Sequence, residues 1–274
     1  MPSDIPLFGR HFKVQVHDVV IEGLKCTFTV EKHLKPDPNT LELNIYNLSQ
    51  SNRKKLEGLP KTTEVKVSLE AGYLDGISQI YLGDVRYIIS TAEGPDVITK
   101  VTSGDGEQKV QTSRVSIPVG AQTDVQTAIR KIAFALGVGE GNLGLLATPT
   151  GRAILFPKGG VLHGNAATEM TAICRSAGLE WSIQDGVLQV LNINETVSKK
   201  FYVLSSSTGM IGAPKVDNTG LLEVSCLMLP DMVPGRHVVL DAIGVKGNYR
   251  IEECKYTGDT HGNDWKIDLK CKPV

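Results

Sequence analysis

Asp259, His261 and Asp264 crowd one loop and are the side chains in this chain best suited to acid–base catalysis. A histidine beside two carboxylates can act as a general base with an orienting acid. Neither a GxSxG nucleophile elbow nor an HExxH zinc helix accompanies them. The loop Gly258-Asp-Thr-His-Gly-Asn263 consists mostly of residues that turns prefer. We therefore interpret it as a turn between two strands.

Six residues, Gly139-Glu-Gly-Asn-Leu-Gly144, match the GxGxxG pattern of dinucleotide-binding proteins. That fingerprint must follow a strand and open a helix, because the phosphates bind at the helix N-terminus. Here the glycines follow a helical stretch instead. We therefore predict a helix-ending loop and no cofactor.

Two histidines and four glutamates are the other candidates for a site. His11 and His17 lie six residues apart on one predicted strand, roughly 20 Å from each other, so they cannot share a metal. The glutamates show no pairing typical of glycoside hydrolysis, although distant carboxylates can meet in a fold. They are Glu57, Glu64, Glu70 and Glu93. We predict no catalytic, cofactor-binding or metal-ligating residues.

The charge balance argues against a protein that grips nucleic acid. The 274 residues include 29 Lys and Arg and 30 Asp and Glu, which gives a net charge of −1. Tight nucleic-acid binding usually needs a basic excess or a clustered basic face. The short cluster Arg53-Lys54-Lys55 lies on a predicted helix and is best explained as a solvated face. An inter-subunit contact is the alternative for this cluster.

Cysteine usage and hydropathy indicate a reducing compartment. The five cysteines include no CxxC pair and mostly occupy apolar positions, so we expect buried thiols rather than disulfides or zinc ligands. They are Cys26, Cys174, Cys226, Cys254 and Cys271. The first residues predict no signal peptide, and no apolar run approaches the roughly 18 residues of a membrane helix. We expect no membrane insertion.

Strand patterns dominate both ends of the chain. Apolar and polar residues alternate in about six segments between residues 10 and 101, and again from about residue 201 to the C-terminus. A short helix is predicted over Ser51–Leu56. The N-terminal strands alone are enough to curl into a sandwich or a barrel.

The middle of the chain changes to a helical period. Val125, Ile129, Ile132 and Leu136 form one apolar stripe, with Thr123 or Asp124 as cap and Gly137 as end. A second helix is predicted from about Ala166 to Ala177, capped by Asn165, and Asp185-Gly186 signals a type I′ hairpin. Turn residues over 103–122 predict a linker.

These patterns predict an α+β, mainly β fold in three parts. They are an N-terminal β-barrel module at residues 1–112, a small α/β domain at 113–200 and a C-terminal β module at 201–274. The third part is short for a full barrel. Strands from the N-terminal segment or a neighbouring chain are expected to complete it.

Four ordered stretches of the chain are distinctive. They are Leu41-Glu-Leu-Asn-Ile-Tyr-Asn-Leu-Ser49; Ile80-Tyr-Leu-Gly-Asp84 with Ser103-Gly-Asp-Gly106; Thr208-Gly-Met-Ile-Gly-Ala-Pro214; and Tyr249-Arg-Ile251 with Gly258-Asp-Thr-His-Gly-Asn263 and Trp265. Together they resemble the baseplate hub proteins of tailed phages, of the late-control-protein-D type. Each stretch alone is weakly specific, whereas the ordered set spans nearly the whole chain.

The resemblance implies two tail-tube-like β-barrel modules with a small α/β domain inserted between them, and a homotrimer whose ring contains six barrels. Such a ring connects a hexameric tail tube, or a tube-initiator protein, to a trimeric central spike and lets DNA pass. Tape-measure and baseplate wedge proteins are further partners to consider. The protein would reside in the virion, in the tail baseplate, after assembly in the bacterial host cytoplasm. It would be structural rather than an enzyme.

Two alternatives from other classes remain open. A tail-tip cell-wall (peptidoglycan) hydrolase would use carboxylates such as Asp259 or Glu93. A nucleic-acid-binding module would bind DNA tightly and with a steep salt dependence. For the hub, we expect an acidic or mixed channel lining, because each phosphate contact by Lys or Arg adds affinity and would impede passage.

Overall fold

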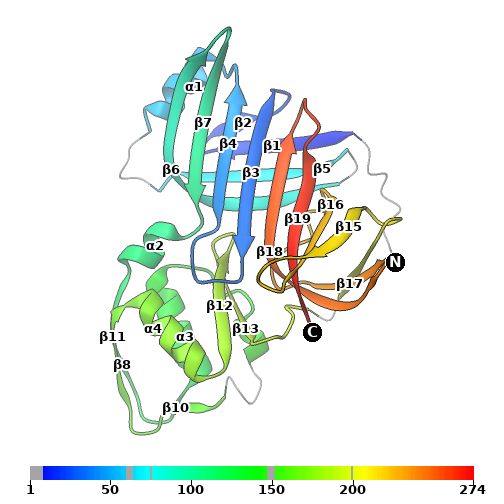
Figure 1. The fold of residues 1–274 in the computed structure, drawn as a ribbon. Coiled ribbons are helices and arrows are strands. Elements are labelled where there is room, and N and C mark those ends of the chain that lie inside the picture. Colours follow the sequence, from blue (N-terminus) through cyan, green and yellow to red (C-terminus); the bar gives the residue numbers. More distant parts are fainter. Residues whose placement is uncertain (1–8, 60–63, 75, 147–151, 199) are drawn as a thin grey trace. The chain divides into compact units, whose positions relative to one another are not determined.

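The computed structural model describes residues 9–59, 64–74, 76–146, 152–198 and 200–274 (Figure 1). The chain divides into two compact units, termed unit 1 and unit 2. Unit 1 contains Met1–His33, Thr40–Gly104 and Thr196–Val274, and unit 2 contains Leu34–Asn39 and Asp105–Glu195. The chain is mainly β, as predicted.

The N-terminal part of unit 1 consists of strands and one short helix. They are β1 (Arg10–Val16), β2 (Val19–Ile21), β3 (Cys26–His33), β4 (Thr40–Tyr46), α1 (Gln50–Glu57), β5 (Lys66–Tyr73), β6 (Gly76–Glu93) and β7 (Asp96–Gly104). Helix α1 begins at Gln50, one residue before the predicted start, because the Ser49 hydroxyl accepts the Asn52 N–H at 3.3 Å.

The C-terminal part of unit 1 is formed by strands. They are β14 (Phe201–Ser205), β15 (Met210–Val216), β16 (Leu222–Leu227), β17 (His237–Ala242), β18 (Val245–Asp259) and β19 (Trp265–Pro273). Strands β6 and β18 are long, and each has a β-bulge in its pairing with the strand that follows it, at Arg86 in β6 and at Glu252 in β18.

Thirteen strands in the described part of the chain join into one sheet. Its main path runs β15-β16-β19-β18-β3-β4-β7-β6-β5-β1-β2, and β17 pairs with both β14 and β18. The two parts of unit 1 meet where β18 pairs antiparallel with β3, with Thr257 opposite Thr29. Strands from opposite ends of the sequence therefore share one hydrogen-bonded sheet.

The sheet contains one strand order twice. The N-terminal part runs β3-β4-β7-β6-β5-β1, and the C-terminal part runs β15-β16-β19-β18-β17-β14. In both parts the long bulged strand pairs with one neighbour over its first part, β5 or β17, and with another over its later part, β7 or β19. One difference is that β14 runs parallel to β17, whereas β1 runs antiparallel to β5.

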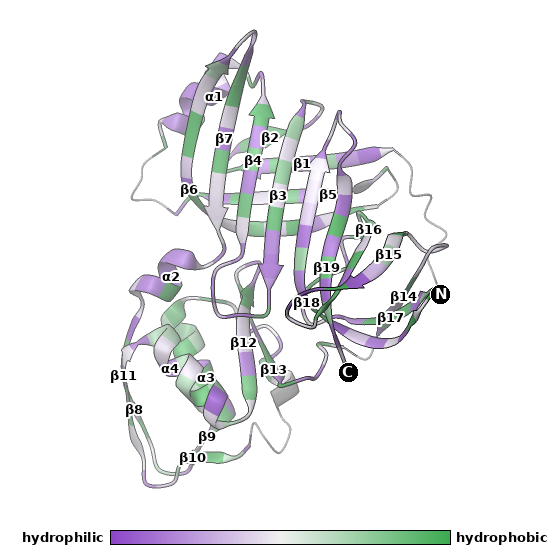
Figure 2. Ribbon diagram, viewed as in Figure 1, coloured by the Kyte–Doolittle hydropathy of each residue, from purple (hydrophilic) through white to green (hydrophobic). Residues whose placement is uncertain are grey.

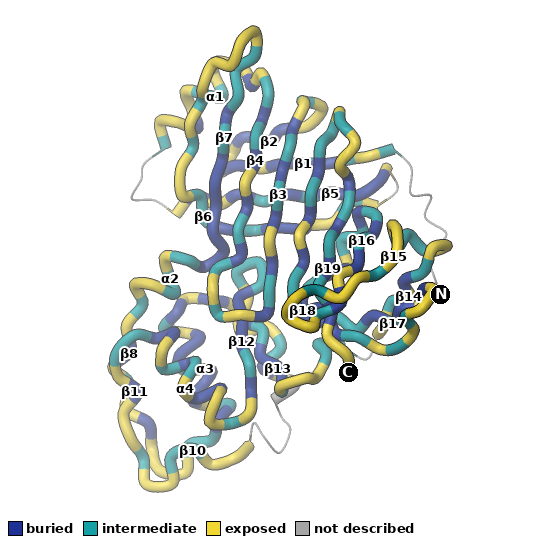
Figure 3. The backbone as a smooth tube through the Cα atoms, in the orientation of Figure 1, coloured by how far each residue is buried: buried dark blue, intermediate teal, exposed yellow. Residues whose placement is uncertain are grey.

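Alternating side chains place the core on one face of this sheet. Leu41, Leu43 and Ile45 of β4 are fully buried, whereas the residues between them face outward. The alternation is visible as hydropathy along β4 in Figure 2 and as burial along β3 and β4 in Figure 3. All five cysteines are free and buried, which confirms that prediction.

Unit 2 has its own core around two helices and several short strands. Its elements are α2 (Glu107–Thr112), β8 (Arg114–Val119), β9 (Thr123–Asp124), α3 (Val125–Leu136), a 3₁₀ turn (Leu143–Leu146), β10 (Ile154–Phe156), β11 (Gly160–Asn165), α4 (Ala166–Ser176), β12 (Leu179–Gln184) and β13 (Val187–Asn192). The core includes the predicted stripe of α3, with Ile129 and Ile132 fully buried.

The predicted ends of these elements are confirmed. The Asp124 carboxylate caps α3 by accepting the Thr127 N–H at 2.7 Å. Hydrogen bonds from the Thr127 side chain and from this N–H lower the pKa of Asp124. Gly137 ends α3 with φ of +67°. Asp185 and Gly186 both have positive φ, as a type I′ hairpin turn requires.

The predicted linker over residues 103–122 is wrong. Helix α2 occupies part of this segment, and β8 pairs with β11 along Arg114–Val119. Gly106 and Pro118 gave the segment its turn signals. In the structure Gly106 is the cap of α2 with φ of +66°, and Pro118 lies in a two-stranded sheet, where a missing N–H is tolerated at an edge.

Candidate assembly surface

On the strands of unit 1, the side chains that point away from the core form one polar surface, termed the outer face. It spans the neighbouring strands β7, β4, β3, β18, β19 and β16. One row across it consists of Lys100, Asn44, Thr27 and Asp259, which lie opposite one another in turn. Because strand residues alternate between faces, pairing of β3 with β18 makes this surface continuous across both parts of unit 1.

Four lysines of the outer face each contact a carboxylate. The pairs are Lys100–Glu42 at 3.3 Å, Lys255–Glu31 at 2.9 Å, Lys266–Asp268 at 3.0 Å and Lys270–Glu253 at 3.1 Å. The hydrogen bond to Glu253 raises the pKa of Lys270. Exposed ion pairs contribute little to stability. Their effect here is to cancel positive charge within the face.

A shallow hollow lies in the middle of the outer face. Its lining residues are Thr27, Phe28, Thr29, Glu42, Asn44, Thr257, Gly258, Asp259 and Asp264. They present mainly hydroxyl, amide and carboxylate groups, and this set, all within the described residues, includes neither a lysine nor a histidine. The hollow therefore offers hydrogen-bonding groups without a cation to hold a phosphate.

The loop that carries Asp259, His261 and Asp264 is shaped by its own backbone. The Asp259 carboxylate accepts the N–H groups of His261 at 2.8 Å and Gly262 at 2.7 Å. The Asp259 N–H in turn donates to the Asp264 carbonyl at 2.6 Å. This carboxylate acts as a turn former, in line with the interpretation from the sequence.

Arg10 holds this loop from the N-terminal end of β1. Its guanidinium donates to the carbonyls of Asp259 at 3.0 Å and Asn263 at 3.1 Å, and to that of Gly262. The same guanidinium lies 5.8 Å from the ring centroid of Trp265, within range of a cation–π contact. No local sequence pattern predicts this contact, because its partners lie at opposite ends of the chain.

A family model for the baseplate hub gp41 matches residues 10–271. The chain belongs to the baseplate hub gp41 family. The resemblance found in the sequence is thereby confirmed, and with it the assignment to phage tail structural proteins. Membership in this family places the hub protein in the tail of a phage virion.

Solved structures of tail proteins share the fold of this hub protein at low identity. The 43 kDa tail protein of prophage MuSo2 from Shewanella oneidensis has a TM-score of 0.69 and 7% identity over 97% of both chains. A tail protein from Neisseria meningitidis MC58 has a TM-score of 0.62 and 12% identity, again over 97% of both.

A third similar structure comes from a secretion system. The E. coli c3393 protein, a component of the type VI secretion system, has a TM-score of 0.63 and 8% identity, over 96% of this chain and 77% of that one. At these identities the likeness concerns the fold. No curated protein matches the chain in sequence.

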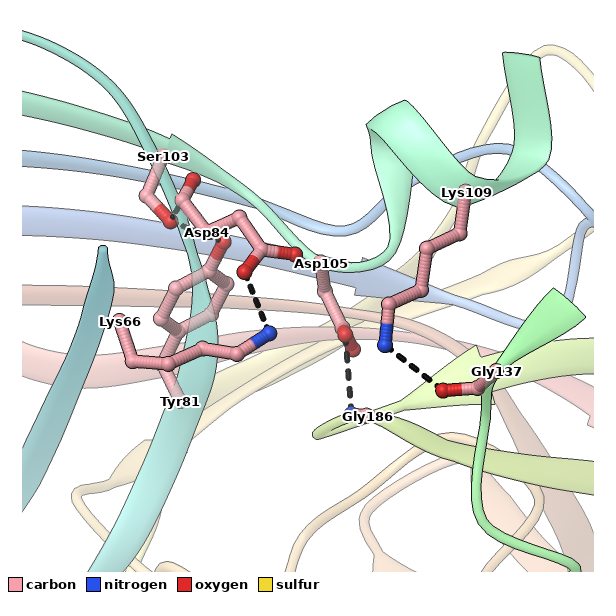
Figure 4. Close-up of polar contacts among 8 residues, drawn as sticks. All are labelled: Lys66, Tyr81, Asp84, Ser103, Asp105, Lys109, Gly137 and Gly186. Carbon is pink, nitrogen blue, oxygen red and sulfur yellow. Dashed lines mark hydrogen bonds and ion pairs between the residues drawn. The ribbon is translucent and has the colours of Figure 1, made fainter. Parts of the chain in front are cut away.

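The Ile80–Asp84 motif of the hub protein is a packing device in unit 1. The buried Tyr81 hydroxyl and the Ser103 hydroxyl are 2.9 Å apart, and Ser103 donates to the Asp84 carbonyl at 2.8 Å (Figure 4). A Cβ at Gly83 would lie 2.3 Å from the Tyr81 hydroxyl. Glycine is therefore required where the tyrosine side chain crosses the strand. Lys66 forms an ion pair with Asp84 at the same place.

The Ser103–Gly106 motif contributes a buried carboxylate to unit 2. Asp105 accepts the N–H groups of Asp185 at 2.6 Å and Gly186 at 2.9 Å, at the tip of the β12–β13 hairpin (Figure 4). Lys109 of α2 donates to the Gly137 carbonyl at 2.7 Å. Both contacts tie α2 and its flanking residues to the rest of unit 2, so this motif also serves the fold.

The other candidates from the sequence stay apart. The glycines of 139–144 let a loop approach β13, since a Cβ at Gly141 would lie 1.9 Å from the Leu188 carbonyl oxygen. His11 lies in β1, and His17 occupies a turn with φ of +53°. Among the described residues no group of His, Cys, Asp and Glu could hold a metal ion.

The glutamates and the basic cluster lie on separate elements. Glu57 ends α1, Glu70 lies in β5 and Glu93 ends β6, whereas Glu64 precedes β5. The basic cluster is on α1, where Lys55 pairs with Asp18 at 2.5 Å and lowers the pKa of that carboxyl group. Across the part of the chain that the structure describes, no helix is long and apolar enough to span a membrane.

Proposed function

We propose that this protein is the hub subunit whose homotrimeric ring connects a hexameric tail tube to a trimeric central spike. The repeated strand order of unit 1 carries this proposal. Because each chain has two similar sheet modules, three chains present six modules. A ring of this kind can match a six-fold partner on one side and a three-fold partner on the other. We assign the two modules to the N-terminal and C-terminal parts of unit 1, and the inserted domain to unit 2.

The outer face supports a role in DNA passage. A polyanion binds through lysines and arginines that neutralise its phosphates, and each such contact adds salt-dependent affinity. Four lysines of the outer face are instead neutralised by carboxylates, and its central hollow contains hydroxyl and acidic groups. A channel lined by this surface would let DNA slide with little retention.

The partners follow from this position in the tail. The ring would contact a tail-tube or tube-initiator protein on one side and a central spike protein on the other. Tape-measure and baseplate wedge proteins are further candidates. Assembly would take place in the bacterial host cytoplasm before the ring joins the baseplate, and its function would need no catalysis.

The native mass of the purified chain tests the ring. Light scattering over a concentration series should show a species of three chains, 89 kDa from a chain mass of 29.6 kDa (3 × 29.6 = 88.8). A stable dimer, or a monomer at every concentration, would contradict a ring built by the chain alone.

A further inference from the structure

The repeated strand order assigns an equivalent to each strand of unit 1. By position in the sheet, β6 corresponds to β18 and β15 corresponds to β3. Within the chain, the part of β18 after its bulge is covered on one side by β19 and on the other side by β3. The corresponding part of β6 and the strand β15 are thus the places to look for a second junction of the same kind.

The part of β6 after its bulge has one open edge. Pairing with β5 ends at Asp84, and beyond it Tyr87–Glu93 pairs with β7 alone among the described strands. Tyr87 is 44% exposed and Ile89 is 52% exposed. An open strand edge with apolar side chains is a template for pairing with another strand.

Strand β15 has the complementary open edge. It pairs with β16 on one side and ends the sheet on the other, within the described residues. Ile211 is 42% exposed and Val216 is 69% exposed, and five of the seven residues of β15 are exposed. By contrast, β3 buries every second residue.

We propose that β15 of one copy pairs antiparallel with Tyr87–Glu93 of the next copy, as β3 pairs with β18 inside the chain. This junction rests on the proposed ring. Six strands separate β15 from β6 in the sheet, and Figure 1 shows the two at opposite sides of unit 1. One chain cannot close on itself, whereas a head-to-tail contact repeated between copies closes a ring.

The equivalence also predicts the register. Glu42 of β4 and Glu223 of β16 are counterparts. Glu42 lies opposite Thr29 and Glu223 lies opposite Lys215, so Lys215 of β15 is the counterpart of Thr29 of β3. The rows across β7 and β19 likewise make Thr91 of β6 the counterpart of Thr257 of β18. Since Thr257 faces Thr29 within the chain, Thr91 should face Lys215 of the neighbouring copy.

A second row supports this register. Asp259 faces Thr27, and the counterparts of these residues are Glu93 and Ile211. Lys215 then lies diagonally next to Glu93, close enough for a cross-strand ion pair. A shift by one residue would turn each side chain to the other face of the sheet.

Disulfide trapping in the full-length chain tests the junction. The double variant Thr91→Cys/Lys215→Cys should form a covalent three-chain species under mild oxidation, because directly opposed residues fall within disulfide range. The five native thiols are buried, so they do not compete. Ala92→Cys/Lys215→Cys is the matched control, since Ala92 faces the opposite side of β6. Thermal melting would verify that both variants fold.

The possible outcomes distinguish a failure of the proposed junction from a failure of the proposed ring. Trapping of the Thr91 pair well above the Ala92 control, reversed by reductant, supports the junction. A three-chain mass by light scattering without trapping above the control would overturn the junction and leave the ring intact. A wild-type chain that stays monomeric at every concentration would overturn both.

Discussion

The ring of Phe28 meets the ring of Trp265 edge-on, with 5.5 Å between the ring centroids. The two residues lie on either side of Gly258, which pairs with both because β18 runs between β3 and β19. A Cβ at Gly258 would lie 2.2 Å from Cζ of Phe28, so only glycine leaves room for this ring. The contact fastens the N-terminal part of unit 1 to the C-terminal part.

Replacing Gly258 by alanine should therefore destabilise unit 1. The added methyl group must displace the Phe28 ring, and overpacking of this kind costs about 1–3 kcal/mol. Urea denaturation followed by tryptophan fluorescence would measure the loss. In a Phe28→Leu background the same change should cost clearly less, because the smaller side chain leaves space. Equal costs in both backgrounds would show that the ring is not the obstacle.

Helix α3 provides a second test, in unit 2. Ile132 is fully buried, so Ile132→Asp places a charge in the core and should cost several kcal/mol, enough to unfold the helix. Phe134 on the same helix is 87% exposed, and Phe134→Asp should change the melting temperature little. Circular dichroism melting compares the two. Similar melting of the Ile132 variant and wild type would refute the assigned core.

The buried thiols predict slow reactivity. Burial raises the pKa of Cys26, Cys174 and Cys271 to about 12. In the native protein at pH 8, DTNB should react slowly with the cysteines, and all five should react in urea.

The raised thiol pKa also predicts a pH dependence of stability. Because these pKa values lie above the unfolded value of 9.0, the neutral thiols stabilise the fold fully below pH 9, and this contribution is lost as the pH rises toward 12. Rapid labelling of any native thiol at pH 8 would contradict the burial on which both expectations depend.

The paired lysines of the outer face predict how charge changes affect DNA. Removing three carboxylates takes away the ion-pair partners of three lysines, and three phosphate contacts give a salt slope of about −2.7 in log K against log salt. The variant is Glu31→Gln/Glu42→Gln/Glu253→Gln, and its control is Glu22→Gln/Glu57→Gln/Glu169→Gln, which lies elsewhere. Retention of short linear duplex DNA should rise only in the first. Equal retention by both would show that the outer face does not meet DNA.

Local signals were enough to predict several elements. Helix α3 carries its cap, its apolar stripe and its glycine end within 14 residues, from Asp124 to Gly137. The Asp185-Gly186 turn sits between its own two strands. Each of these features depends on neighbours in sequence, so periodicity and turn chemistry suffice to locate it.

Features that depend on distant partners could not be predicted in this way. Gly83 resembles a turn residue, yet it lies inside β6 because Tyr81 needs the space. Strand β8 is defined by β11, far along the chain. The outer-face pair Lys255–Glu31 requires the register between β18 and β3, which no local pattern provides. The surface proposed to act in assembly was therefore visible only once these strands were paired.

Electron microscopy of the purified, assembled chain tests the central claim most directly. Class averages viewed along the axis should show a three-fold ring with six similar lobes around an open channel, because each chain contributes the same strand order twice. A two-fold particle, or a three-fold one without an opening, would contradict the proposed hub ring.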